Sequence, residues 1–379
     1  MYSQEDLNSA VAAGAITNEA ADALRAHVAA TKGAVTADAE HFRLITGFND
    51  IFVSIGVIIL LVAMGAIGQA LGGAVMPKPI YDPNLTGDAW REAMAQRRLA
   101  EGVAVSLAAA FVAGTAWLLS EFFTRKRRMA LPSIILLLAF VGGVMAAQTG
   151  VLIGLFDGNG EENDSVAFVL LAVAALITAG AAWLHWRRFM VPITIAAGTA
   201  AVAGTTILLL VAAIGPETGD IETVILSLVF AAGLVVFAFA MRWDISDPRR
   251  ETRRSDVAFW LHLLAAPMIA HPVFALLGVT DGNDIGAGAA IAVVAVYIVF
   301  GLIALAIDRR ALLVSALAYV LIALTFLFRE FGAVELNFAL TALVIGSALL
   351  TLSALWTPIR AAVVRGLPGQ MRQRLPATA

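Results

Sequence analysis

Residues 117–138 read WLLSEFFTRKRRMALPSIILLL, and this stretch decides the fold class. An apolar segment runs into four consecutive basic residues, Arg125 to Arg128, and a second apolar segment follows. Pro132 lies early in that second segment, where the N–H that proline lacks would have no helical partner. We interpret the stretch as two membrane-spanning helices joined by a basic turn, because such turns are typical of the cytoplasmic side.

The composition of the whole chain also indicates a membrane protein. Of its 379 residues, 60% are hydrophobic and 14% are charged, and the mean hydropathy is +0.87. A soluble domain is about 45–50% apolar and about 25% charged. The apolar residues form runs of about 20, which is the length that crosses about 30 Å of hydrocarbon. The chain contains no cysteine, which excludes disulfides and thiolate metal sites.

We therefore predict an all-α, polytopic membrane protein with about ten transmembrane helices. Residues 1–48 are expected to form a small cytosolic helical module, residues 49–358 the transmembrane domain, and residues 359–379 a basic cytosolic tail. The expected spans are 51–75, 99–120, 132–155, 166–186, 191–214, 222–241, 257–278, 285–307, 311–328 and 334–356. The polar run 88–98 is a candidate outward extension of the second span.

Helix-capping signals predict a hairpin within the first 48 residues. Ser3 with Asp6 resembles a capping box, and Gly14 suits the left-handed turn that ends the first helix. Thr17 is expected to cap the second helix. Helices this short are marginal alone, so we expect them to dock on each other, on the membrane surface or on a partner chain, self-association included. We expect no cleavable signal peptide, since polar sequence precedes the first apolar run.

The distribution of basic residues predicts the orientation. With the N-terminus inside, 20 of the 25 lysines and arginines flank the inner ends of the spans. The outer turns near residues 157–162, 216–222 and 281–284 are acidic. We expect a multi-pass protein of a bacterial inner membrane with both termini in the cytoplasm. Its basic turns are expected to contact anionic lipid headgroups, worth about 1 kcal/mol each, rather than nucleic acid.

An arginine pair recurs at four of the expected inner turns, at intervals of about 60 residues. One interpretation is a repeated two-helix hairpin; the other is that positive-inside selection alone places arginines at every inner turn. Under either interpretation, the paired arginines lie in basic turns and are expected to face lipid. They are Arg127, Arg128, Arg187, Arg188, Arg253, Arg254, Arg309 and Arg310.

Candidate functional residues are few, because no Asp, Glu, Lys or Arg lies near the middle of an expected span. The seventh span carries His262 and His271, with prolines 267 and 272. A separation of nine residues puts the two histidines on opposite helix faces. Our sharper hypothesis is a polar pocket in the outer half of the membrane, built from His271, Gln148, Tyr297 and Tyr319. The alternative is that these groups only hydrogen-bond between helices, at about 1 kcal/mol each.

Other motifs indicate packing rather than chemistry. Gly68-x-x-x-Gly72 and Gly150-x-x-x-Gly154 are typical of helices that approach closely. The sequence holds no P-loop, HExxH or GxSxG motif. We expect no metal and no cofactor.

The segment Gly14-Ala-Ile-Thr-Asn-Glu-Ala-Ala21 resembles a motif of uncharacterised bacterial membrane proteins. These alphaproteobacterial-type polytopic proteins form a domain-of-unknown-function family with an N-terminal G-x-I-[ST]-x-x-x-A helical hairpin. The segments 41–52 and 260–274 are similar to such proteins as well. The resemblance implies no established activity and no site residues.

Two functional classes follow. The first is a non-catalytic membrane protein, acting as a scaffold, sensor or assembly factor through its N-terminal hairpin. The second is a transporter or channel for a small neutral or apolar molecule that uses a polar pocket near His271. An enzyme ranks third, since the sequence shows no acid–base pair.

Overall fold

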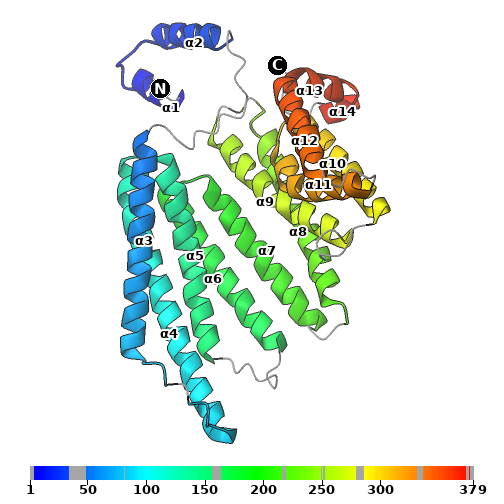
Figure 1. The fold of residues 1–379 in the computed structure, drawn as a ribbon. Coiled ribbons are helices and arrows are strands. Elements are labelled where there is room, and N and C mark those ends of the chain that lie inside the picture. Colours follow the sequence, from blue (N-terminus) through cyan, green and yellow to red (C-terminus); the bar gives the residue numbers. More distant parts are fainter. Residues whose placement is uncertain are drawn as a thin grey trace. The chain divides into compact units, whose positions relative to one another are not determined.

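The computed structural model describes residues 4–33, 48–80, 82–155, 164–215, 219–248, 250, 252–278, 286–330, 336–372 and 375. Every regular element in these ranges is helical (Figure 1), which confirms the all-α fold. The chain divides into two compact units, Met1–Leu44 and Ile45–Ala379.

The first unit carries the helices α1 (Gln4–Ala12) and α2 (Asn18–Gly33), which lie within the expected module of residues 1–48. Gly14 has φ +71°, the left-handed conformation that glycine adopts readily. The hydroxyl of Thr17 accepts a hydrogen bond of 3.1 Å from the Ala20 amide, as a helix cap does. Arg25 of α2 donates to the side chain of Asn8 in α1 across 2.8 Å. The predicted cap at Ser3 lies outside the described residues.

The second unit carries the membrane-spanning helices. Within the described residues, nine helices are long and apolar enough to cross a membrane, which confirms the first nine expected spans. They are α3 (Phe48–Val75), α4 (Gly87–Ser120) continued by the π-helical turn η1 (Glu121–Lys126), α5 (Ala130–Leu155), α6 (Asp164–Phe189), α7 (Ile193–Ile214), α8 (Ile221–Ile245), α9 (Arg253–Leu276), α10 (Ala287–Ile307) and α11 (Ala311–Glu330). The polar run 88–98 does extend α4.

The tenth expected span is broken. Helix α12 (Asn337–Ala354) is followed by α13 (Trp356–Arg365) at an angle of 77°, so the count reaches ten only if this bent pair is one span. Pro358 provides a local reason, because it lacks the N–H that would bond the Ala354 carbonyl. A short helix, α14 (Gly369–Arg372), follows.

The basic turns share a backbone conformation. Among the described residues, the non-glycine residues with positive φ are Arg128, Met190, Arg250 and Asp308, at 53°, 55°, 54° and 58°. One lies in each of the four basic turns, at intervals of about 60 residues. The helices on the two sides of each turn pack along each other: α4 on α5, α6 on α7, α8 on α9 and α10 on α11. Common turn geometry favours the interpretation of a repeated two-helix hairpin.

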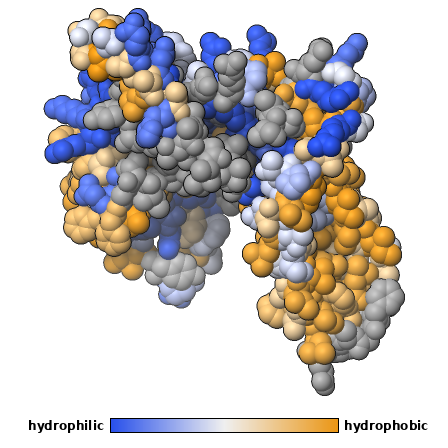
Figure 2. Space-filling view, turned by 90° about the horizontal axis from the view of Figure 1, so that it is seen from above, coloured by the Kyte–Doolittle hydropathy of each residue, from blue (hydrophilic) through white to orange (hydrophobic). Residues whose placement is uncertain are grey.

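The small-residue motifs do bring helices together. A Cβ added at Gly68 would lie 2.7 Å from the Ala108 Cα, and one at Gly72 would lie 2.5 Å from the Ala104 Cα. Both distances are shorter than van der Waals contact, so glycine is what lets α3 and α4 approach. In Figure 2, hydrophilic residues lie mainly in the upper part of the view, and a large hydrophobic surface lies at the lower right.

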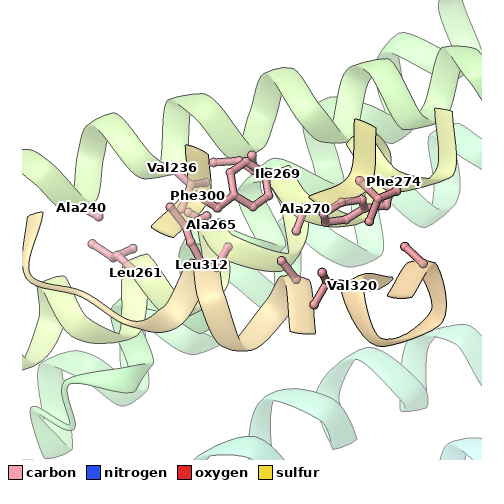
Figure 3. Packing of buried hydrophobic residues seen from close by; sticks show 14 of the residues in the cluster. Val236, Ala240, Leu261, Ala265, Ile269, Ala270, Phe274, Phe300, Leu312 and Val320 are labelled. Atoms are coloured by element: carbon pink, nitrogen blue, oxygen red, sulfur yellow. The ribbon is translucent and has the colours of Figure 1, made fainter. Parts of the chain in front are cut away.

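Helix α9 lies at the centre of the C-terminal helices, because it packs against α7, α8 and α11. It is the most buried of the spans and remains one helix through both prolines. Small residues such as Ala265 and Ala270 on α9 allow this close packing. Figure 3 shows Ile269 and Phe300 meeting beside Val236 in this core.

Candidate functional site

The four residues of the predicted polar pocket do not form one site. Nδ1 of His271 and the Tyr319 hydroxyl are 2.7 Å apart, which links α9 to α11. The amide of Gln148 instead donates to the hydroxyl of Thr178 in α6, across 3.2 Å. Tyr297 packs against apolar side chains of the core. His271 is solvent- or lipid-exposed, and its observed bond is of the interhelical kind.

The eight arginines of the basic turns differ in exposure. All except Arg309 and Arg310 are exposed, as a lipid-facing position requires. Arg188 is exposed and also bonds Glu121 across 2.6 Å, which ties the second basic turn to the first. Arg310 is half-buried and lies over the ring of Trp356, with its guanidinium carbon 4.6 Å from the ring centroid. Arg309 is buried, so the prediction that it faces lipid is wrong.

Arg309 belongs to a buried ionic cluster that also contains Asp244 and His262. Nη2 of Arg309 lies 2.6 Å from Oδ1 of Asp244, and Nε2 of His262 lies 2.8 Å from Oδ2 of the same carboxylate. The exposed fractions of Asp244, His262 and Arg309 are 2%, 2% and 3%. Nη2 of Arg309 also donates to the Ser255 carbonyl across 3.3 Å. The cluster therefore joins α8, α9 and the α10–α11 turn.

The sequence interpretation missed this cluster. The expected sixth span ends at residue 241, three residues before Asp244, so this carboxylate lies outside the expected spans. A signal was present, because Phe230, Phe237 and Asp244 recur every seven residues and so share one face of α8. That face is turned toward α9. The predicted opposite placement of His262 and His271 agrees with their partners, Asp244 of α8 and Tyr319 of α11.

Asp308, the residue next to Arg309, forms a second hub. Its carboxylate accepts from Arg250 across 2.8 Å and from the indole of Trp356 across 2.7 Å. Nε of Arg360 lies 3.6 Å from it. Asp308 thus connects the α8–α9 turn and α13 to the α10–α11 turn.

An apolar groove lies among α8, α9 and α10, with one further lining residue, Leu312, at the start of α11. Its volume is about 460 Å³, and every lining residue is apolar. The lining consists of Phe230, Leu234, Phe237, Ile269, Val273, Ala295, Val296, Val299, Phe300, Ile303 and Leu312. Figure 3 shows three of these, Ile269, Phe300 and Leu312, close together within the packed core.

Phe237 connects the groove to the ionic cluster. Its ring lines the groove and also meets the ring of His262 edge-on, with the centroids 5.3 Å apart. Ile269, another lining residue, follows His262 by seven positions on the same face of α9. The buried cluster of Asp244, His262 and Arg309 is therefore separated from the groove by the Phe237 side chain.

A second groove, of about 450 Å³, lies on α3, α4 and α5. Its walls are mostly glycine and alanine, with Gln69 as the polar residue at its edge. No buried ionisable group is part of it. The groove at α8, α9 and α10 is the stronger candidate because it adjoins one.

A buried histidine in the N-terminal half of the chain packs among aromatic side chains. His185 is fully buried, and the rings of Trp117, Phe140 and Phe189 surround it at centroid distances of 4.6–6.0 Å. Thr194 lies 3.4 Å from its Nδ1. These side chains therefore connect the helix pair α4–α5 to the helix pair α6–α7, near their basic turns.

Comparison of the chain with protein-family profiles, with curated proteins and with solved structures finds no match. Among the described residues, no group of three His, Asp or Glu side chains is placed to hold a metal ion. The resemblance of the N-terminal motif stays a prediction. The interpretation of function therefore depends on the groove and the cluster.

Proposed function

We propose that this chain is a non-catalytic membrane protein that binds a small apolar molecule in the groove of α8, α9 and α10 and carries it within or across the bilayer. The observation that supports this proposal is the groove itself. Its volume of about 460 Å³ falls in the range of about 300–1,000 Å³ that ligand sites occupy. Its wholly apolar lining suits an uncharged hydrocarbon and offers nothing to a charged substrate.

The proposal moves the binding site away from His271. The Leu234 and Val299 side chains on the rim of the groove are 46% and 51% exposed. Exposed apolar side chains of this kind on a spanning helix face acyl chains, so a ligand enters from the side, out of the bilayer. We also propose the orientation that the basic turns predict, with these turns and both termini on the cytoplasmic side of a bacterial inner membrane.

Photolabelling tests the proposed binding site. The protein is reconstituted in nanodiscs with an alkane that carries a diazirine, and the labelled residues are mapped by mass spectrometry. We expect labels on α8 and α10 lining residues. Val296→Trp should fill the groove and abolish this labelling, whereas Ile298→Trp should not. Ile298 is 58% exposed on the same helix and does not line the groove. Labelling spread evenly over all exposed helix faces would contradict the proposal.

A second candidate function is a scaffold that acts through the N-terminal hairpin. The observation in its favour is that residues 1–44 form a compact unit of their own, with the Arg25–Asn8 hydrogen bond linking its two helices. Removal of residues 1–44 separates the two functions. If the protein is a scaffold, the shortened chain should lose a co-purifying partner. If it is a carrier, the shortened chain should still be photolabelled in the groove, and no partner should be lost.

A further inference from the structure

We infer that the ligand of the groove is a neutral molecule with a hydroxyl group, and that this hydroxyl donates a hydrogen bond to Nδ1 of His262. This inference rests on the proposed function, because it names the chemical class that the same groove accepts. It follows from the hydrogen-bonding state of the ionic cluster and from the position of Phe237.

The partners of Asp244 determine which nitrogen of His262 carries hydrogen. The Asp244 carboxylate accepts hydrogen bonds from Nη2 of Arg309 across 2.6 Å and from Nε of Arg309 across 3.5 Å, so a guanidinium balances its charge. An ionised carboxylate only accepts hydrogen bonds. The contact of 2.8 Å with His262 therefore requires the hydrogen on Nε2. In the neutral ring, Nδ1 then holds a lone pair and is an acceptor.

Nδ1 of His262 is buried and has no hydrogen-bond partner among the described residues. The ring as a whole is 2% exposed. A buried acceptor without a partner costs about 1–3 kcal/mol, so a molecule that brings a donor to this atom is favoured over one that brings a methyl group.

The surroundings of His262 restrict the kind of donor. Arg309 is close by, which disfavours a cation such as an ammonium group. A carboxylate or a phosphate diester has no hydrogen to donate. A neutral hydroxyl, as in an alcohol or a phenol, fits both conditions. The apolar body of such a molecule matches the apolar lining of the groove.

Phe237 is the side chain between the two parts of this site. It lines the groove on one side and touches the His262 ring on the other. Ligand access to Nδ1 therefore requires the Phe237 ring to turn aside. In that arrangement the hydroxyl takes the place of the Phe237 ring beside the imidazole, and the hydrocarbon chain extends toward Ile269 and Val273.

A pair of photoreactive probes of equal length tests the inference, one ending in a hydroxyl and the other in a methyl group. In nanodiscs, the wild-type groove should take up the hydroxyl probe about tenfold more strongly, as one hydrogen bond to a buried acceptor provides. His262→Phe should remove this preference, so that the two probes label the groove equally. His271→Phe is the matched control on the same helix and should retain the full preference.

The outcomes separate this inference from the proposed function. Equal labelling by both probes in the wild-type protein, or an unchanged preference in His262→Phe, would overturn the inference and leave the groove as an apolar site. Failure of both probes to label the groove would overturn both. Should His262→Phe not fold, His262→Gln decides, because its amide can donate to Asp244 and still accept from the ligand. It should keep part of the preference, and a complete loss would count against the inference.

Discussion

Nη2 of Arg309 lies 2.6 Å from Oδ1 of Asp244, and both side chains are almost completely buried. The two residues are 65 positions apart in the chain, one at the end of α8 and the other in the α10–α11 turn. Together with His262 on α9, they form a buried polar cluster beside the apolar core of these helices. This arrangement predicts an asymmetry among arginines that look alike in the sequence.

Substitution of Arg309 should be far more harmful than substitution of an exposed turn arginine. Arg309→Gln leaves the Asp244 carboxylate buried without its main counter-charge, which costs about 3–5 kcal/mol for a broken buried pair. Arg254→Gln removes an exposed arginine from another basic turn and should change stability by less than about 1 kcal/mol. Unfolding in a graded series of SDS and mild detergent measures both.

A double substitution checks the cause of that loss. Asp244→Leu combined with Arg309→Leu removes both charges, and replacement of a whole buried pair by apolar residues is often neutral. We therefore expect the double variant to be more stable than Arg309→Gln alone. Equal stabilities of the two would mean that packing, rather than an unpaired charge, causes the loss.

The glycines of α3 provide a second matched pair. Gly72 faces α4, and a Cβ there would lie 2.5 Å from the Ala104 Cα, whereas nothing lies within 4 Å of a Cβ at the neighbouring Gly73. Gly72→Ala should force α3 and α4 apart and cost about 1–3 kcal/mol. Gly73→Ala should be neutral or stabilising by up to about 1 kcal/mol, since alanine is the better helix former. The same unfolding assay separates them.

The successes of the sequence interpretation have a common physical cause. Hydrocarbon thickness demands long apolar runs, and a chain that meets this demand shows it in the order of its residues. The spans α3 to α11, the hairpin turn at Gly14 and the close approach at Gly72 were all predictable, because each depends on residues near one another in sequence. The break between α12 and α13 was not predicted, although Pro358 was a local signal for it.

The candidate site was not predictable in the same way. Its ionic cluster joins Asp244, His262 and Arg309, which are distant in the chain, and a count of charges near the span centres ignored groups at the span ends. Arg309 resembles the exposed arginines of the other turns, and only the packing of α8 and α9 shows that it is buried. Conversely, Gln148 and His271 are expected at a similar depth in the membrane, but they do not meet. Gln148 hydrogen-bonds from α5 to α6, and His271 hydrogen-bonds between α9 and α11.

The contact between His271 and Tyr319 should behave as a simple interhelical bond. Tyr319→Phe removes the hydroxyl that lies 2.7 Å from His271 and should lower stability by about 1 kcal/mol. Labelling of the groove by the alkane probe should not change, because neither residue lines it. Loss of that labelling in Tyr319→Phe would restore the hypothesis of a binding site near His271.

Asp308 should hold α13 against the end of the bundle. The Trp356 indole and the Arg360 guanidinium both reach its carboxylate, at 2.7 Å and 3.6 Å, so Asp308→Ala removes both attachments. The natural chain has no cysteine, which makes single-cysteine labelling selective. Val364 is buried on α13. A cysteine introduced by Val364→Cys should react slowly with a maleimide in the otherwise natural chain and several-fold faster when Asp308→Ala is added.

An exposed position on the same helix controls for general changes in reactivity. Ala362 is exposed, so a cysteine introduced by Ala362→Cys should react at the same rate with or without Asp308→Ala. Trp356→Phe keeps an aromatic ring in the apolar contact with Leu305 and Leu313 but removes the N–H. It should raise the reactivity at position 364 less than Asp308→Ala does. Equal reactivity at position 364 in all these chains would mean that apolar packing alone holds α13, with no contribution from the Asp308 carboxylate.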